Sequence, residues 1–131
     1  MSKKKVIIIG ANFAGLSAAG QFATAAREAG AEVDVTIIDR SFDFEWTPNI
    51  HEIISGVKSR QQLHLSRTDI IGRLGHQFLM DQVIALDPEN QQLTLKHRGD
   101  LSFDVCLIAC GHTSRYLGIA GANQHALPFR S

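Results

Sequence analysis

The chain has 131 residues, 44% of them hydrophobic, and its 13 basic and 13 acidic residues give a formal net charge of zero. This length suits one domain with a substantial core and excludes two full domains. The balanced charge excludes a general attraction to nucleic acid or to anionic membranes, and no apolar stretch approaches the roughly 18 residues of a transmembrane segment.

The first predicted elements are a strand over residues 6–9, a glycine turn and a helix that begins near Phe13. The uninterrupted apolar run suits a parallel strand buried on both faces. Gly10 allows a sharp turn, where backbone N–H groups and the positive end of the helix dipole can bind a diphosphate, while Gly15 lets the helix pack closely on the strand. The candidate cofactor-binding residues of this turn are Gly10, Ala11, Asn12, Phe13, Ala14 and Gly15.

The turn departs from the GxGxxG fingerprint at its middle position, which is Asn12. The fingerprint's glycine lets the backbone approach a pyrophosphate, so the Asn12 side chain must bend away or take part in binding. Asparagine tolerates unusual backbone angles and carries an amide donor. We therefore expect the architecture to be retained, while the affinity of the turn for a ligand stays open.

The helix continues to Ala29 and is capped by Gly30, and a second strand covers residues 33–38. Asp39, at the tip of that strand, can accept hydrogen bonds from an adenosine ribose. Strand, glycine turn, helix and acidic strand end follow in the order of a dinucleotide-binding βαβ unit. The alternative is a Rossmann-like unit whose turn binds nothing.

The loop after Asp39 is predicted to pack onto the domain through its aromatic side chains, and two short helices are expected over residues 50–55 and 66–74. Strand-like patterns then cover residues 77–86, 92–96 and 101–108, with turns between them. A small antiparallel meander is the assembly that we expect from these three strands. The last of them ends in the segment Ala109, Cys110 and Gly111, where glycine allows a close approach to another backbone or to a ligand.

Cys106 and Cys110 lie on one predicted strand, where four steps of about 3.3 Å separate them beyond disulfide reach. We expect buried, unreactive thiols. The six histidines show no metal-binding spacing, so no metal site is predicted.

Four segments carry a resemblance to a known family. VIIIGANFAGLSAA, FEWTPNIHEIISG, LDPENQQLTL and the closing LSFDVCLIACGHTSRYLGIAGANQHALPFRS resemble flavin-dependent pyridine-nucleotide oxidoreductases, in particular the type II NADH dehydrogenase and sulfide:quinone reductase branch. The resemblance covers nearly the whole chain. It implies an α/β fold, a Rossmann-like FAD/NAD(P)-binding domain with a parallel sheet and a small antiparallel β-meander, spanning residues 1–131.

The resemblance implies FAD as the cofactor of this domain. The turn from Gly10 to Gly15 would then hold the pyrophosphate and Asp39 the ribose, with Arg40 beside the adenine and Val83 touching it through its backbone.

Two further segments would lie near the flavin part of the cofactor. Ala109, Cys110 and Gly111 match a segment that passes near the flavin nucleotide, with Cys110 in place of the usual threonine. Pro48 matches a loop near the isoalloxazine ring.

Relatives continue into a second Rossmann domain for NAD(P)H and return with a GlyAsp motif, so the sequence resembles the first part of a longer enzyme. For that parent enzyme the resemblance implies hydride transfer from NAD(P)H to flavin and electron delivery to a quinone or another acceptor. No side chain is a confident catalytic acid or base: Glu45, His51 and Glu52 fit a solvated loop face better.

The absence of a secretory signal predicts a cytoplasmic protein, and attachment to the periphery of the inner membrane through sequence absent here stays open, as does a homodimer. Three functions compete. The chain is the FAD-binding portion of an oxidoreductase, a stand-alone Rossmann module that binds NAD or another adenine nucleotide, or an interaction protein without a nucleotide.

Overall fold

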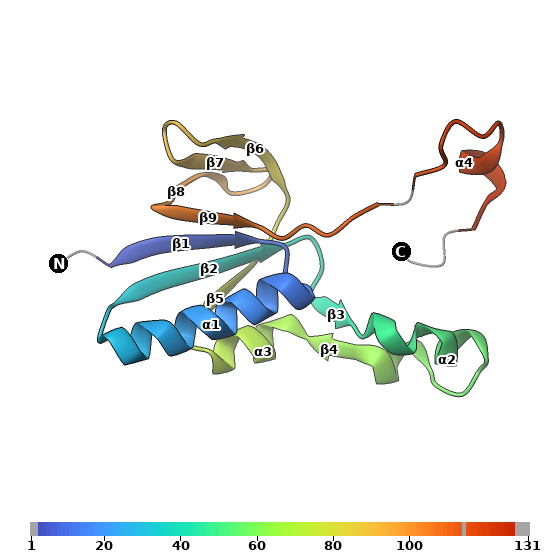
Figure 1. Ribbon diagram of the computed structural model, residues 1–131, viewed down its shortest axis with the longest axis horizontal. Helices are drawn as coiled ribbons and strands as arrows, with labels where there is room; N and C mark the ends of the chain where they lie inside the picture. The colour runs from blue at the N-terminus through green and yellow to red at the C-terminus, as the bar shows by residue number, and fades with distance from the viewer. Residues whose placement is uncertain (1–2, 114, 128–131) are drawn as a thin grey trace.

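A computed structural model of the chain describes residues 3–113 and 115–127 (Figure 1). Within this part, the main sheet has four strands, all parallel, in the order β5-β2-β1-β9. Its strands are β1 (Lys4–Ile9), β2 (Val33–Asp39), β5 (Gln77–Met80) and β9 (Val105–Ile108).

Two helices and a small sheet cover opposite faces of the main sheet (Figure 1). Helices α1 (Phe13–Ala29) and α3 (Arg67–Arg73) lie on one face. The other face carries an antiparallel sheet in the order β6-β7-β8. Its strands are β6 (Val83–Asp87), β7 (Gln92–Leu95) and β8 (Gly99–Ser102). The fold class predicted from the sequence is therefore confirmed.

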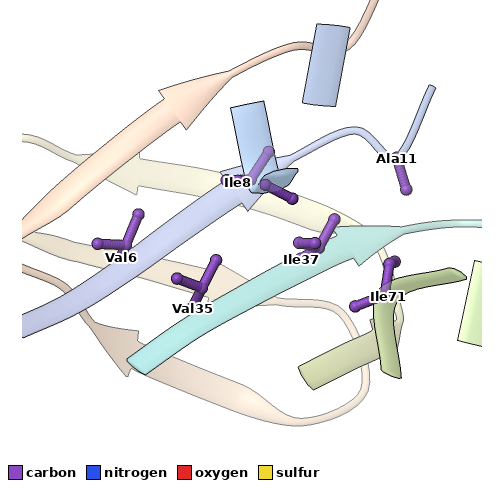
Figure 2. Packing of buried hydrophobic residues seen from close by; sticks show 7 residues of the cluster. Val6, Ile8, Ala11, Val35, Ile37 and Ile71 are labelled. Atoms are coloured by element: carbon purple, nitrogen blue, oxygen red, sulfur yellow. The ribbon is translucent and has the colours of Figure 1, made fainter. Parts of the chain in front are cut away.

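The main sheet is buried on both faces, as the apolar run of β1 predicts. Successive side chains of a strand point to opposite faces, so Val6 and Ile8 of β1 pack toward the helices while Ile7 packs toward the small sheet. The helix-side core also includes Val35, Ile37 and Ile71, which Figure 2 draws around Ile8. On the opposite side Ile38, Leu93, Leu95 and Phe103 complete a second cluster.

Two of the predicted strands are wrong in extent and in sheet assignment. The pattern over residues 77–86 divides into β5 of the parallel sheet and β6 of the meander, and that over residues 101–108 divides into β8 and β9. At the second break the Asp104 N–H donates to the Lys5 carbonyl at 2.8 Å, and the Lys5 N–H donates to the Asp104 carboxylate at 2.7 Å. These bonds attach the chain to the edge of β1, so β9 runs beside β1 and is not the last strand of the meander.

The excursion between β2 and β5 contains a pair of short strands that the sequence patterns did not predict. Strands β3 (Asp43–Glu45) and β4 (His64–Ser66) pair antiparallel, and α2 (Ile50–Ile54) lies between them in the chain. Short 3₁₀ turns over Thr47–Asn49 and Arg60–Leu63, and a final helix α4 (Ala122–His125), complete the described elements.

Aromatic packing fixes this excursion to the start of α1, as predicted. The Phe13 ring lies 5.0 Å from the Phe44 ring and 5.4 Å from the Trp46 ring, both edge-on. The three rings lie beside the glycine turn. None of the helices in residues 3–113 and 115–127 has the length and apolar character needed to cross a membrane.

Candidate functional site

The glycine turn joins β1 to α1 at the carboxyl edge of the parallel sheet. Gly10 has φ of +103°, a conformation that side chains rarely adopt, and its N–H donates to the Ile38 carbonyl at 2.8 Å. A Cβ atom on Gly10 would lie 2.3 Å from the Ala109 carbonyl oxygen, and one on Gly15 would lie 1.8 Å from the Gly10 carbonyl oxygen. Backbone atoms approach both positions too closely for a side chain, so both must be glycine. The contact of Gly10 with Ala109 also shows that the segment after β9 lies beside the turn.

The start of α1 leaves backbone donors for a ligand. Helix geometry gives the N–H groups of Phe13, Ala14 and Gly15 no acceptor within the helix, and the Asn12 side chain does not cap them. The Ala11 N–H, by contrast, donates to the Asp39 carboxylate at 2.8 Å. The backbone donors that remain available at this helix end therefore belong to residues after Ala11.

Arg67, which the sequence reading missed, is the central side chain of the site. It projects from the first residue of α3, is only 4% exposed, and donates hydrogen bonds to four acceptors. These are the Asn12 side-chain oxygen at 2.6 Å, the Ser41 carbonyl at 2.7 Å, the Asp39 carboxylate at 2.8 Å and the Ala11 carbonyl at 3.0 Å. Burial lowers the pKa of Arg67, while the charges of Asp39 and Asp43 oppose that shift. A guanidinium nevertheless stays protonated in proteins.

Asp39 is held by the protein itself. One carboxylate oxygen accepts from the Ala11 N–H, and the other accepts from Arg67 and, at 3.1 Å, from the Ser41 N–H. An ionised carboxylate offers about four acceptor positions, so one is left for a ribose hydroxyl. The structure thus fixes the orientation of Asp39 and leaves room for its predicted ribose contact.

A cleft of about 470 Å³ opens beside the turn, between the carboxyl ends of the parallel strands and the first strand of the meander. Six of the predicted cofactor-binding residues line it: Gly10, Asn12, Asp39, Arg40, Val83 and Cys110. Ile84 and Ile108, 59% and 63% exposed, add apolar surface to its wall.

The other predicted site residues do not line this cleft. Ala11 is fully buried under the turn. Pro48 lies in a 3₁₀ turn beyond β3, outside the cleft, and so does Glu52 of α2, which was expected on a solvated loop face and pairs with Lys58 at 2.6 Å. The remaining predicted residues, which neighbour the cleft in sequence without lining it, are Phe13, Ala14, Gly15, Ala109 and Gly111.

The two thiols are free, but the expectation that both are buried is wrong for Cys110, which is exposed and lines the cleft. The strand that carries Cys106 ends at Ile108, so Cys110 already lies beyond the sheet. Cys106 is half-buried, and burial, reinforced by the neighbouring Cys110, raises the pKa of its thiol.

Asp81 is a buried acidic residue at the cleft that the sequence patterns did not indicate. It lies in the break between β5 and β6, where its Oδ1 accepts from the Gln82 N–H at 2.7 Å and from the His97 N–H at 3.3 Å. Its Oδ2 has no hydrogen-bond donor among the described residues, and the Arg98 side chain lies 3.8 Å away. Asp81 therefore links the turn between β7 and β8, through His97, to the segment that joins β5 to β6.

The sequence profile of the pyridine nucleotide-disulphide oxidoreductase family matches residues 4–130. The chain belongs to this family. Members of the pyridine nucleotide-disulphide oxidoreductase family are FAD-dependent NAD(P)H oxidoreductases, and the fold and glycine turn described above are those of its FAD/NAD-binding domain.

Individual relatives are distant. The type II NADH:quinone oxidoreductase of Staphylococcus aureus (strain NCTC 8325) is 24% identical over 127 residues, covering 95% of this chain and 30% of the relative. The sulfide:quinone oxidoreductase of Aquifex aeolicus has a TM-score of 0.77 at 18% identity, over 92% of this chain and 27% of that structure. NDH2 from Plasmodium falciparum, solved in complex with NADH, has a TM-score of 0.72 at 20% identity, over 94% of this chain and 25% of that structure.

The structural likenesses establish the fold alone, since their identities are low. The chain spans about 30% of the length of the curated relatives that it matches.

Proposed function

We propose that the chain is the FAD-binding portion of an NAD(P)H-dependent flavin oxidoreductase that passes electrons to a quinone or a similar acceptor. One observation carries the proposal. Gly10 and Asn12 of the glycine turn and Asp39 line one cleft at the carboxyl edge of a parallel sheet, which is where dinucleotides bind in folds of this class. Family membership and the names of the relatives supply the flavin and the quinone.

The residues of the cleft fit the adenylate half of FAD. The glycine turn ends at the start of α1, where N–H groups without an acceptor in the helix can meet a diphosphate. Ile84 and Ile108 offer apolar surface to a ring, and Asp39 keeps one acceptor position for a ribose. The volume of about 470 Å³ lies within the usual range of small-molecule sites.

The residues in the cleft and beside it then have defined roles in binding. The N–H groups of Phe13, Ala14 and Gly15 bind the diphosphate, Asp39 orients the ribose, and Val83 and Arg40 lie beside the adenine. Cys110, with Ala109 and Gly111, faces the start of the flavin nucleotide, and Pro48 belongs to the loop nearer the ring. A flavin held by these residues would supply the redox chemistry of hydride and electron transfer, while the residues of the chain would bind and orient it.

A stand-alone module that binds NAD or another adenine nucleotide is the second candidate. The cleft collects residues of the adenylate side, whereas Pro48 lies outside it. FAD and NAD share an adenylate half, so this geometry suits both cofactors. The two candidates differ in that the second does not bind a flavin ring.

Titration of the purified chain with FAD, NAD, ADP and FMN separates the candidates. The proposal expects FAD to bind more tightly than ADP, with a change in flavin fluorescence, and FMN, which lacks the adenylate, to bind weakly. Equal affinities for NAD, ADP and FAD would favour the second candidate. A chain that binds none of these nucleotides while remaining folded by circular dichroism would contradict both and favour an interaction protein. The cytoplasmic location and the homodimer stay predictions of the sequence.

A further inference from the structure

Asn12 occupies the one position at which the turn departs from its fingerprint, and Arg67 holds its side chain. We infer that Arg67 aims the Asn12 amide at the ligand, so that Asn12 Nδ2 donates a hydrogen bond to a phosphate oxygen of a bound adenine diphosphate. This inference rests on the proposed function and adds to it a specific donor and the residue that positions it.

The orientation of the Asn12 amide follows from the chemistry of its partner. The Arg67 Nη2 atom lies 2.6 Å from the amide, and a guanidinium can only donate hydrogen bonds. The atom that faces Arg67 must therefore be the oxygen, Oδ1. The NH₂ group consequently points away from Arg67, and among the described residues no acceptor is bonded to it.

The backbone does not explain the choice of asparagine. Asn12 has φ of −99°, which any residue adopts, and its side chain makes no capping bond to α1. It is exposed and lines the cleft beside Gly10. The NH₂ group therefore lies at the start of the helix, next to the N–H groups that an anion would meet.

The position of the Arg67 guanidinium does not depend on Asn12, because three of its four acceptors belong to other residues. Asp39 and the carbonyl oxygens of Ala11 and Ser41 already hold the guanidinium, which is 4% exposed. Asn12 is attached to this guanidinium by a short, charge-assisted bond. A cation on Oδ1 polarises the amide and makes its N–H groups better donors. Arg67 itself is shielded from the cleft, so it acts as a positioning residue through Asn12.

Replacing Asn12 with the glycine of the fingerprint tests the donor directly. If asparagine is only a tolerated substitute, Asn12→Gly should bind ADP equally well or more tightly. Our inference expects the opposite, an ADP affinity about 5- to 20-fold weaker by calorimetry, the effect of one hydrogen bond to a charged acceptor. Adenosine, which has no phosphate, should bind both proteins equally. An unchanged or improved ADP affinity would overturn the inference.

A double-mutant cycle tests the role of Arg67. Arg67→Lys cannot bridge the four acceptors, so it should weaken ADP binding, and adding Asn12→Gly should then cost little more. Full additivity of the two losses would overturn the positioning role. If Arg67→Lys does not fold, the side-chain amide signals of Asn12 in the unaltered chain provide the second measurement, since they must shift on addition of ADP. Unmoved signals would overturn the inference.

Failure of this inference is distinguishable from failure of the proposed function. A folded, unaltered chain that binds no ADP contradicts both. A chain that binds ADP with the same affinity whether residue 12 is asparagine or glycine contradicts the donor role alone.

Discussion

Arg67 and Asp39 form an ion pair beside the entry to α1, with side chains that are only 5% and 16% exposed. Charges that leave water lose hydration, and such a pair is retained only where further hydrogen bonds satisfy it. Here two carbonyls and an amide oxygen satisfy Arg67, and two backbone N–H groups satisfy Asp39. The pair thus links β2, the glycine turn and α3 in one network.

Removing Asp39 should therefore affect stability as well as binding. We expect Asp39→Ala to lower the free energy of unfolding by about 3 kcal/mol, because a buried guanidinium loses its counter-charge. The double variant Asp39→Ala with Arg67→Met should lose less than the sum of the two single changes. Urea unfolding followed by circular dichroism measures all three. Losses that simply add would mean that the two side chains act independently.

The residues of this site were only partly predictable. Gly10, Gly15 and Asp39 follow from local sequence, because their spacing within one βαβ unit is a known pattern. Arg67 does not, since its acceptors lie between 26 and 56 residues earlier in the chain. A charged residue at the start of a predicted helix reads as solvent-exposed until the fold brings those acceptors to it.

At the scale of elements, β1 and α1 were predictable because their periodicity is uninterrupted and glycines mark their ends. The strand boundaries from β5 onward were not, because the alternating pattern continues through Asp104 and because the two polar residues Asp81 and Gln82 interrupt the apolar pattern only briefly. Each aspartate accepts backbone N–H bonds at its break, at 2.7 Å from Gln82 and from Lys5 respectively. Those bonds form only in the folded protein, so the pattern alone could not assign β5 and β9 to the parallel sheet.

Two glycines of α1 should respond oppositely to alanine. In Gly15→Ala the new Cβ meets the Gly10 carbonyl oxygen, a backbone atom that cannot move without distorting the turn, so we expect destabilisation of about 2 kcal/mol. Gly20 has nothing within 4 Å of an added Cβ, so Gly20→Ala should stabilise the chain by about 0.5–1 kcal/mol. Thermal unfolding compares the pair. Equal melting temperatures would contradict the close packing of turn and helix.

Asp104 should make the junction of β9 with β1 sensitive to acid. The Lys5 N–H and then the Lys4 ammonium lower the pKa of the Asp104 carboxyl below its usual value. Because the folded-state pKa lies below the unfolded one, the stabilisation is present above the unfolded pKa and is lost as pH falls through the folded pKa.

The corresponding variant is Asp104→Asn. It should be less stable than the unaltered chain at neutral pH, and the difference should narrow below about pH 4. Denaturant unfolding at several pH values measures the difference. If the stability difference between the two proteins stays constant or increases as the pH falls, the ionised Asp104 carboxylate does not stabilise the junction of β9 with β1.

In the molecule as a whole, the described residues that form the candidate site gather at one edge of the parallel sheet. The parallel strands β1 and β2 end there, α1 begins there, and β6 and the segment after β9 close its sides (Figure 1). Several large apolar side chains stay exposed around it, among them Ile84 and Ile108. The chain spans about 30% of the length of its curated relatives, and the electron acceptor belongs to the proposed function.

We propose that this edge binds the adenine diphosphate part of FAD, and two-dimensional amide NMR during titration with FAD can follow that binding residue by residue. We expect the backbone signals of Asn12, Phe13, Ala14 and Val83 to shift with a single saturable dissociation constant, while those of α4 stay unchanged. Signals that stay unmoved at saturating FAD, or shifts confined to residues away from the glycine turn, would contradict it.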